Sequence, residues 1–278
     1  MFLTAVKIWV FSALRRGIHP VCNPGFGFVK DAQDGGGFSE AHVCVPWKAW
    51  QKSQINISST LKTHHGYLFK HPAMLTIENL WFRYPNPQVE VLTNWSGEIL
   101  PGVTLVQGGD GRGKSTLLRL LAGALPADEG QLRINGVSFK EKPDAYRQQL
   151  FWMDPRADTF DQLTPSQYFE DIRGRYPDFD VNQIAPLVEG LGLEPHTGKQ
   201  LFMLSTGSKR KVWLTAAFAS GAAVLLLDEP FAALDAPSIA FVKEQLQGIS
   251  SQPGRAAVIA DYSAPTGVSL AGMIDLGG

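Results

Sequence analysis

One short segment, residues 108–115, constrains the fold of this chain more than any other. It reads Gly-Gly-Asp-Gly-Arg-Gly-Lys-Ser and fits the pattern G-x-x-x-x-G-K-[ST] in full. The apolar run at 103–106 before it predicts a buried strand, and the leucines within 117–121 predict a helix after it. Glycines let successive backbone N–H groups turn towards a phosphate chain, and the helix adds the positive end of its dipole. We therefore predict a phosphate-binding loop, with Lys114 against the β- and γ-phosphates and the Ser115 hydroxyl on Mg²⁺.

A second segment places two carboxylates after an apolar run. Val224–Leu227 is followed directly by Asp228 and Glu229, which is typical of a buried strand whose carboxyl end opens into a polar site. Alone, this pattern also fits a surface turn. Together with a phosphate-binding loop, it predicts that Asp228 holds Mg²⁺, often through water, and that Glu229 orients or deprotonates the attacking water.

The remaining pattern alternates strands and helices. We expect further strands at 75–82, 91–92, 99–100, 132–134, 151–153, 223–227 and 257–260. Thr164 and Gln167 predict a capping box around Pro165, and 181–191 predicts a second amphipathic helix. Another helix is expected after Pro237. This order is typical of an α/β fold with a mainly parallel sheet flanked by helices, a small antiparallel β piece and a helical insert at about 155–203.

Residues 1–73 differ in composition from residues 74–278. The first segment carries eight Lys or Arg against three Asp or Glu, both cysteines and five of the six histidines. It shows no sustained hydrophobic period, so it is either an accessory or targeting segment, or a poorly ordered extension outside the native protein with Met74 as the true start. We favour the second interpretation, because patterned sequence begins abruptly at Met74.

The body, 74–278, carries 17 Lys or Arg against 23 Asp or Glu, with no cysteine and one histidine, His196. This composition excludes a Cys/His zinc site or a thiol nucleophile in the body. The sequence also lacks the run of ~18–20 apolar residues that a membrane-spanning helix needs.

Several motifs, in this order, resemble those of the ATP-binding subunits of ABC transporters. Leu204–Ser208, Leu-Ser-Thr-Gly-Ser, is similar to the family's LSGGQ signature and stands shortly before the Asp228 strand. Glu229-Pro230 and Ala233-Leu234-Asp235 match the residues that the family carries directly after that strand, and Tyr84 stands where the family has an aromatic residue that stacks on adenine. The compact length resembles small bacterial exporter-type subunits. The resemblance implies a P-loop NTPase core of the ABC type.

The resemblance also implies a dimeric mechanism. Two such domains, identical or different, pack head to tail with ATP between one subunit's phosphate loop and the partner's signature, where Ser205 and the Gly207 N–H meet the γ-phosphate. The helical insert docks a transmembrane permease subunit, which places the chain in the cytoplasm on the inner face of the membrane. The implied ATP-binding residues are Tyr84, Gly108, Gly109, Asp110, Gly111, Arg112, Gly113, Lys114, Ser115, Thr116, Ser205, Gly207 and Asp235. Glu229 and Lys114 are the implied catalytic residues, and Ser115, Asp228 and Asp154 the implied Mg²⁺ ligands.

Three departures from the family pattern qualify the implied activity. Asp154 stands where the family has a glutamine, Thr206 and Ser208 replace residues of the signature, and Asp261-Tyr262 follows the 257–260 strand where the family places a histidine on the γ-phosphate. Losing one transition-state donor typically costs ~10²–10³ in rate, so we expect slow hydrolysis unless Tyr262 substitutes. Because Glu229 is present, we still favour an active ATP hydrolase that powers an ABC membrane transporter. The alternative is a nucleotide-gated, weakly hydrolysing subunit paired with a more active partner. Relatives acting on ribosomes or DNA fit less well, because the chain has one phosphate loop, no heptad run and no basic stripe; we expect no nucleic-acid partner.

Overall fold

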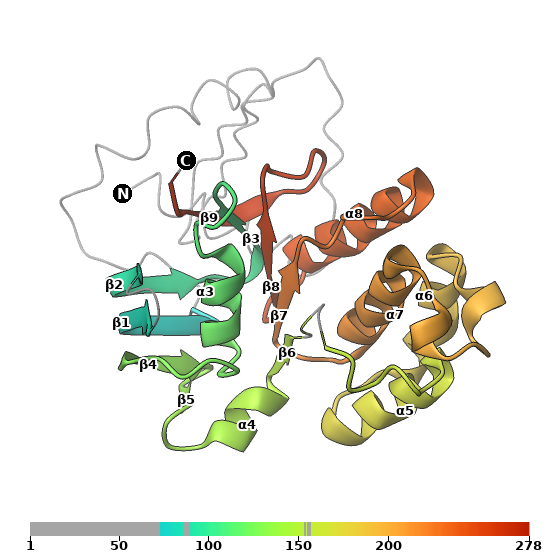
Figure 1. The fold of residues 1–278 in the computed structure, drawn as a ribbon, viewed down its shortest axis with the longest axis horizontal. Helices are drawn as coiled ribbons and strands as arrows, with labels where there is room; N and C mark the ends of the chain where they lie inside the picture. Colours follow the sequence, from blue (N-terminus) through green and yellow to red (C-terminus); the bar gives the residue numbers. More distant parts are fainter. Residues whose placement is uncertain (1–72, 86–88, 153, 155–156, 278) are drawn as a thin grey trace, which may run out of the picture. The chain divides into compact units, whose positions relative to one another are not determined.

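The computed structural model describes residues 73–85, 89–152, 154 and 157–277. The sequence-based expectations for the N-terminal segment, apart from its last residue, therefore lie outside the described residues. Within the described part, the chain forms two sheets and a set of helices between and around them (Figure 1). No described helix combines the length and the apolar composition needed to cross a bilayer.

The larger sheet has five parallel strands in the order β6-β7-β8-β3-β9. Its strands are β3 Gly102–Gln107, β6 Leu150–Trp152, β7 Val224–Asp228, β8 Ala256–Asp261 and β9 Leu270–Asp275. The central strands are almost fully buried, as expected for a parallel sheet covered on both faces. The mainly parallel sheet predicted from the sequence is confirmed.

The smaller sheet is antiparallel, with the order β2-β1-β4-β5. Its strands are β1 Leu75–Tyr84, β2 Val89–Ile99, β4 Glu129–Ile134 and β5 Val137–Ser138. The small antiparallel piece is confirmed, but the expectation of two short strands at 91–92 and 99–100 was wrong, because β2 is continuous between them. Its middle carries exposed polar residues and Asn94 at φ 49°, since β2 is an edge strand with β1 as its partner.

Side-chain alternation along the parallel strands creates two hydrophobic cores, one on each face of the sheet. Leu225 and Leu227 of β7 join the core that contains helices α7 and α8, whereas Leu226 of the same strand joins the core that contains helix α3 and β1. In Figure 1, α3 and the antiparallel sheet accordingly lie on one side of the parallel sheet, and α7 and α8 on the other. The two cores hold the shared sheet, and the loops at its ends, in place.

The helices are α3 Lys114–Leu121, α4 Pro143–Gln148, α5 Pro165–Arg175, α6 Ile184–Gly190, α7 Thr206–Ala219 and α8 Ala236–Ser250, with short 3₁₀ turns at Val181–Gln183, Glu194–His196 and Leu201–Met203. The capping box of α5 is confirmed, since both of its reciprocal hydrogen bonds are present. The predicted 181–191 helix begins only at Ile184, which leaves Pro186 in the first turn, where its missing N–H breaks no helical bond.

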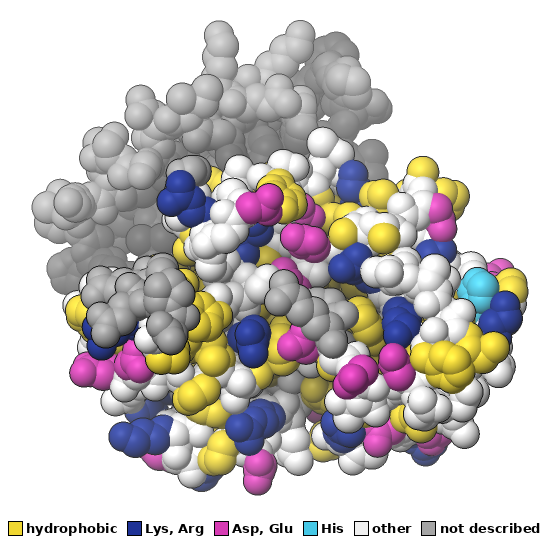
Figure 2. All heavy atoms as spheres, viewed as in Figure 1, with side chains coloured by type: hydrophobic (Ala, Val, Ile, Leu, Met, Phe, Trp, Pro, Cys, Tyr) yellow, Lys and Arg dark blue, Asp and Glu magenta, His cyan; other side chains and the backbone are white. Residues whose placement is uncertain are grey.

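Strand β9 was not predicted from the sequence, which placed the last strand at 257–260. Its residues are mostly exposed, and Gly272 interrupts the apolar pattern. The strand forms because β3 offers an open edge, to which β9 pairs in parallel. On the face shown in Figure 2, Lys and Arg side chains of the described residues lie interspersed with Asp and Glu.

Candidate active site

Three of the predicted site segments lie at one edge of the parallel sheet, where neighbouring strands end. β7, β8 and β3 lie side by side, with Asp228 paired to Ala260 and Gln107 paired to Asp261. The phosphate loop follows β3, Glu229 follows β7 and Tyr262 follows β8. Open α/β sheets bind ligands at the carboxyl ends of their strands, so the fold brings these three segments to the position where a ligand is expected.

The phosphate loop has the strand–loop–helix context predicted from its motif. Gly111 and Gly113 adopt φ values of 71° and 92°, which side-chain-bearing residues rarely adopt. Gly113 is also the N-cap of α3, and its carbonyl accepts from Leu117 N at 2.8 Å. These conformations turn the backbone into a curve at the positive end of the α3 dipole.

Lys114 reaches back over this loop from the first position of α3. Its side chain is buried, with 7% of the residue exposed, and Nζ donates to Gly108 O at 2.7 Å and to Gly109 O at 3.0 Å. The two carbonyls fix the ammonium over the loop. A buried cation held by neutral carbonyls would gain a much stronger partner if an anion entered the loop.

Tyr262 meets the same loop from the end of β8. Its hydroxyl donates to Asp110 Oδ1, and the Lys114 Nζ lies 4.3 Å from the centre of its ring. The hydrogen bond to Asp110 and the negative charge of that carboxylate raise the pKa of Tyr262 to about 12. The phenol is therefore neutral and remains a hydrogen-bond donor throughout the physiological pH range.

Glu229 is held in an uncommon backbone conformation directly after Asp228. Its φ is 46°, a left-handed value that costs free energy in a residue with a side chain, and its N–H donates to Ala260 O at 2.9 Å. Its carbonyl accepts from Ala232 N at 3.1 Å. The hydrogen bond to β8 thus holds the turn that begins at Glu229, directly after β7.

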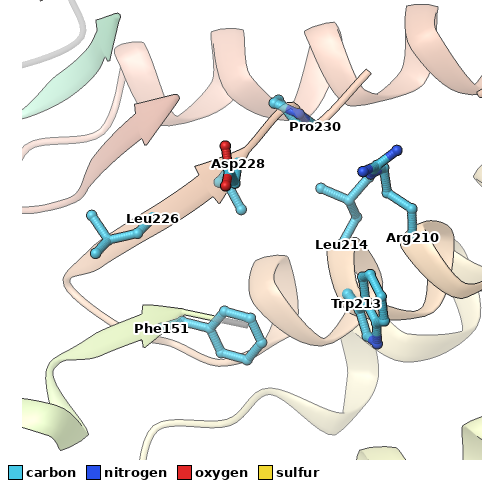
Figure 3. Close-up of a pocket in the computed structure, with 8 residues that line it drawn as sticks. Phe151, Arg210, Trp213, Leu214, Leu226, Asp228 and Pro230 are labelled. Atoms are coloured by element: carbon cyan, nitrogen blue, oxygen red, sulfur yellow. The ribbon is translucent and has the colours of Figure 1, made fainter. Parts of the chain in front are cut away.

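Arg210 of α7 was not singled out by the sequence analysis. Its guanidinium donates to Ala232 O, and it lines a cavity of about 30 Å³ together with Asp228, Trp213 and Pro230 (Figure 3). Burial lowers the pKa of Arg210, while the nearby Glu229 and Asp228 carboxylates act in the opposite direction. This residue therefore contributes positive charge beside both carboxylates. The sequence feature that could have indicated Arg210 is its position two residues after the signature-like segment Leu204–Ser208.

The expected Mg²⁺ ligands offer oxygen atoms, which suit this cation. Ser115 is exposed at the start of α3, and Asp228 is partly exposed at the end of β7. Among the described residues, no three His, Cys, Asp or Glu side chains come together as a metal site. The donor set fits an ion that takes its other ligands from phosphate oxygens and water. Asp154 lies just after β6, as expected, and its carbonyl accepts from Ala157 N at 3.0 Å; its role stays a prediction.

The signature-like segment forms the start of α7. Ser205 is the N-cap, and its Oγ accepts from Ser208 N at 3.1 Å. Gly207 is buried against the 229–235 loop, since a Cβ at this position would lie 2.2 Å from Ala233 O. Ser205 and Thr206 are exposed, which leaves the positive end of the α7 dipole open to a further partner.

Asp235 and Tyr84, expected to contact nucleotide, make intramolecular contacts that the sequence did not predict. Asp235 is the N-cap of α8, accepting from Ser238 N at 2.9 Å, and its Oδ2 lies 2.6 Å from Lys211 Nζ. The hydrogen bond from Lys211 holds the pKa of Asp235 below its usual range. The Tyr84 hydroxyl lies 3.0 Å from Thr116 Oγ1, beside the first turn of α3. Their nucleotide contacts stay predictions.

Comparison with known proteins extends these observations. Residues 92–232 match the family model described as ABC transporter. The chain is 30% identical over 149 residues to the cytochrome c biogenesis ATP-binding export protein CcmA of Pseudomonas fluorescens strain Pf0-1, covering 54% of this chain and 71% of the relative. It is 32% identical over 184 residues to the taurine import ATP-binding protein TauB of Pseudomonas fluorescens strain Pf-5, covering 66% and 68%.

Solved structures share the fold at lower sequence identity. An ABC transporter ATP-binding protein from Pyrococcus furiosus superposes with a TM-score of 0.58 at 22% identity, covering 73% of this chain and 96% of that one. A dimeric ATP-binding cassette bound to ADP and Pi superposes with a TM-score of 0.58 at 19% identity, covering 68% and 88%. With the matched family model, these findings show that the chain belongs to the ABC transporter family, as one of its ATP-binding subunits.

Proposed function

We propose that the chain hydrolyses Mg²⁺-ATP at the carboxyl edge of its parallel sheet and thereby powers a membrane transporter. The observation that carries this proposal is the position of Lys114, buried over a glycine-turned loop and hydrogen-bonded to Gly108 O and Gly109 O. The loop N–H groups and the α3 dipole would bind the phosphates, and Lys114 would neutralise their charge. Ser115 and Asp228 would hold Mg²⁺, which polarises the terminal phosphate when bound.

Glu229 is the proposed general base. Its carboxylate would accept the proton of a water whose oxygen attacks the γ-phosphorus, and the bond from that phosphorus to the β-phosphate oxygen would break to give ADP and inorganic phosphate. The hydrogen bond from Glu229 N to Ala260 O fixes this residue at the strand ends. Positive charge from Arg210 lies beside the same carboxylate.

A second copy or a related ATP-binding domain would complete the site. The exposed start of α7, with Ser205 and Thr206 at its surface, supports this arrangement because its open N–H groups suit a phosphate presented by another subunit. The proposed permease-docking face is the helical insert, where Phe202 and Met203 leave 51% and 60% of their surfaces exposed. We place the subunit at the inner face of the cell membrane on this basis.

The substitution Glu229→Gln tests hydrolysis against the alternative of nucleotide gating with little turnover. The proposal predicts that phosphate release from Mg²⁺-ATP falls by roughly 10²–10⁴-fold, because a general base is lost, while ATP binding is retained. The matched control is Glu244→Gln, which removes the same charge from an exposed position on α8. Equal phosphate release by wild type and Glu229→Gln would refute the assignment of the base, and equally low release by both would favour the weakly hydrolysing alternative.

A further inference from the structure

Arg210 of α7 is hydrogen-bonded to the turn that carries Glu229. Its guanidinium donates to Ala232 O, and within the turn Ala232 N donates to Glu229 O at 3.1 Å. Ala232 is therefore bonded to Glu229 through its N–H and to Arg210 through its carbonyl. Figure 3 shows Arg210 on α7 and Asp228 at the end of β7 on opposite sides of the cavity that both line.

This turn contains two residues in an uncommon backbone conformation. Glu229 has a φ of 46° and Ala233 a φ of 60°, and both carry a side chain. Such conformations cost free energy and persist only where surrounding contacts hold them. At the start of the turn, that contact is the bond from Glu229 N to Ala260 O of β8. Towards its end, the contact is the charge-assisted bond from Arg210 to Ala232 O.

Helix α7 contacts the 229–235 loop with one face. Three residues on this face, three and four positions apart along the helix, make the contacts: Gly207, Arg210 and Lys211. Of these three, Arg210 contacts the loop nearest in sequence to Glu229, and its charge also interacts with the Glu229 and Asp228 carboxylates. Arg210 is thus the residue on this face that is best placed to affect Glu229.

The position of Glu229 matters more for hydrolysis than for nucleotide binding. A general base acts only within hydrogen-bond reach of the water that it deprotonates, and a displacement of about 1 Å can lower the rate by about 10²-fold. The phosphates, in contrast, would be bound by the loop before α3 and by Lys114, which is held by Gly108 O and Gly109 O. Loosening the Glu229 turn should therefore slow hydrolysis and leave ATP binding intact.

We propose that Arg210 is a positioning residue for hydrolysis, whose hydrogen bond to Ala232 O keeps the Glu229 carboxylate in place at the attacking water. This assignment rests on the proposed function, since it takes Glu229 as the general base. Arg210 acts through Glu229 and does not itself contact the nucleotide. Helix α7 thereby has a role in the chain's own site, in addition to the role proposed for its exposed start in a partner's site.

The test is a double-mutant cycle on the full chain, with kcat and KM for Mg²⁺-ATP measured by phosphate release from radiolabelled ATP. Arg210→Met keeps an unbranched side chain and removes the charge and the donor. We expect it to lower kcat by about 10- to 100-fold and to leave KM within about twofold. In the Glu229→Gln background, the same substitution should lower kcat by less than about twofold, because the residue through which Arg210 acts is already disabled.

Two further variants separate positioning from a general structural role. Arg210→Lys keeps the charge and a donor, so we expect it to restore kcat to within about fivefold of wild type. Arg147→Met is the matched control, since the Arg147 guanidinium also donates to a backbone carbonyl, Gly123 O at 3.4 Å, beyond the end of α3. This control should hydrolyse ATP at the wild-type rate. If circular dichroism shows that Arg210→Met is unfolded, Arg210→Gln takes its place in the cycle.

Three results would overturn the role of Arg210: an unchanged kcat in Arg210→Met, a loss that falls on KM instead of kcat, or the same fold-loss of kcat with Glu229 and with Gln at that position. The last result would mean that Arg210 acts independently of Glu229. Failure of the proposed function looks different, because Glu229→Gln alone would then release phosphate at the wild-type rate, and both assignments would be wrong.

Discussion

The phosphate loop and the start of α7 both require glycine, but for different physical reasons. Gly113 adopts φ 92°, so the requirement comes from its own backbone conformation. Gly207 lies in helix α7 without a positive φ, and its requirement comes from Ala233 O, which a Cβ would approach to 2.2 Å. The first requirement is local in sequence, whereas the second depends on how the 229–235 loop packs against α7.

This difference explains how strongly each region is marked in the sequence. A loop built from backbone conformations leaves a short and strict motif, which is why residues 108–115 predict their own structure. The start of α7 is shaped by contacts with residues that lie far along the chain. Thr206 and Ser208 differ from the family's usual residues at these positions. The fold accommodates them because the close contact with Ala233 is made at Gly207, between them.

The substitution Gly207→Ala is expected to have the largest effect on folding stability. Alanine favours helices intrinsically, but here its Cβ would overlap a backbone carbonyl that cannot turn aside. We expect the free energy of unfolding to fall by about 3 kcal/mol, at the upper end of overpacking costs, in urea denaturation. Thr206→Ala, at the exposed preceding residue, is the control and should change it by less than about 0.5 kcal/mol. A stable Gly207→Ala variant would show that the contact with Ala233 does not constrain α7.

The substitution Gly113→Ala is expected to cost somewhat less stability and to damage nucleotide binding as well. The left-handed conformation costs an alanine about 1–2 kcal/mol, and its Cβ would lie 2.6 Å from Val91 Cγ1, a side-chain atom that can shift. Gly109→Ala is the matched control, because its Cβ would meet its nearest neighbour, Arg112 Cγ, at 3.8 Å. Equal stability of the two variants by thermal denaturation would contradict the conformational explanation.

The substitution Asp235→Ala is expected to lower the free energy of unfolding by about 1 kcal/mol, the usual loss when an N-cap side chain is removed. Asp235→Asn keeps the cap of α8 and removes the ion pair with Lys211, so it should lower the free energy of unfolding by only a few tenths of a kcal/mol. Urea denaturation at neutral pH is the measurement that checks both values. A larger loss in Asp235→Asn than in Asp235→Ala would mean that the ion pair, not the cap, is the main contribution.

The effect of Asp235 should also depend on pH. The folded-state pKa of Asp235 is lowered, so its stabilisation is present above the unfolded value of 3.8 and is lost as the pH falls through the folded value. The difference in unfolding free energy between wild type and Asp235→Ala should therefore stay constant from about pH 5 to pH 8 and shrink below about pH 4. A difference that grows on acidification would contradict this sign.

Sequence reasoning predicted the site elements that local patterns encode. The strand–loop–helix at 103–121 and the strand ending at Asp228 follow from apolar runs and glycines. The side-chain contacts between distant segments were not predictable, because each depends on strand order. Tyr262 meets Asp110 since β8 pairs with β3. Strand β9 was missed for the same reason, because pairing to β3, not its own exposed and Gly-interrupted pattern, makes it a strand.

Steady-state release of phosphate from Mg²⁺-ATP by wild type and Lys114→Ala is the most direct test of the account. Removing the ammonium held over the loop should lower the rate by about a hundredfold or more, since a charge-assisted contact to the terminal phosphates is lost. The control variant Lys140→Ala, which removes an exposed lysine after β5, should release phosphate at the wild-type rate. If Lys114→Ala released phosphate as fast as wild type, the loop at 108–115 would not be the site of ATP hydrolysis.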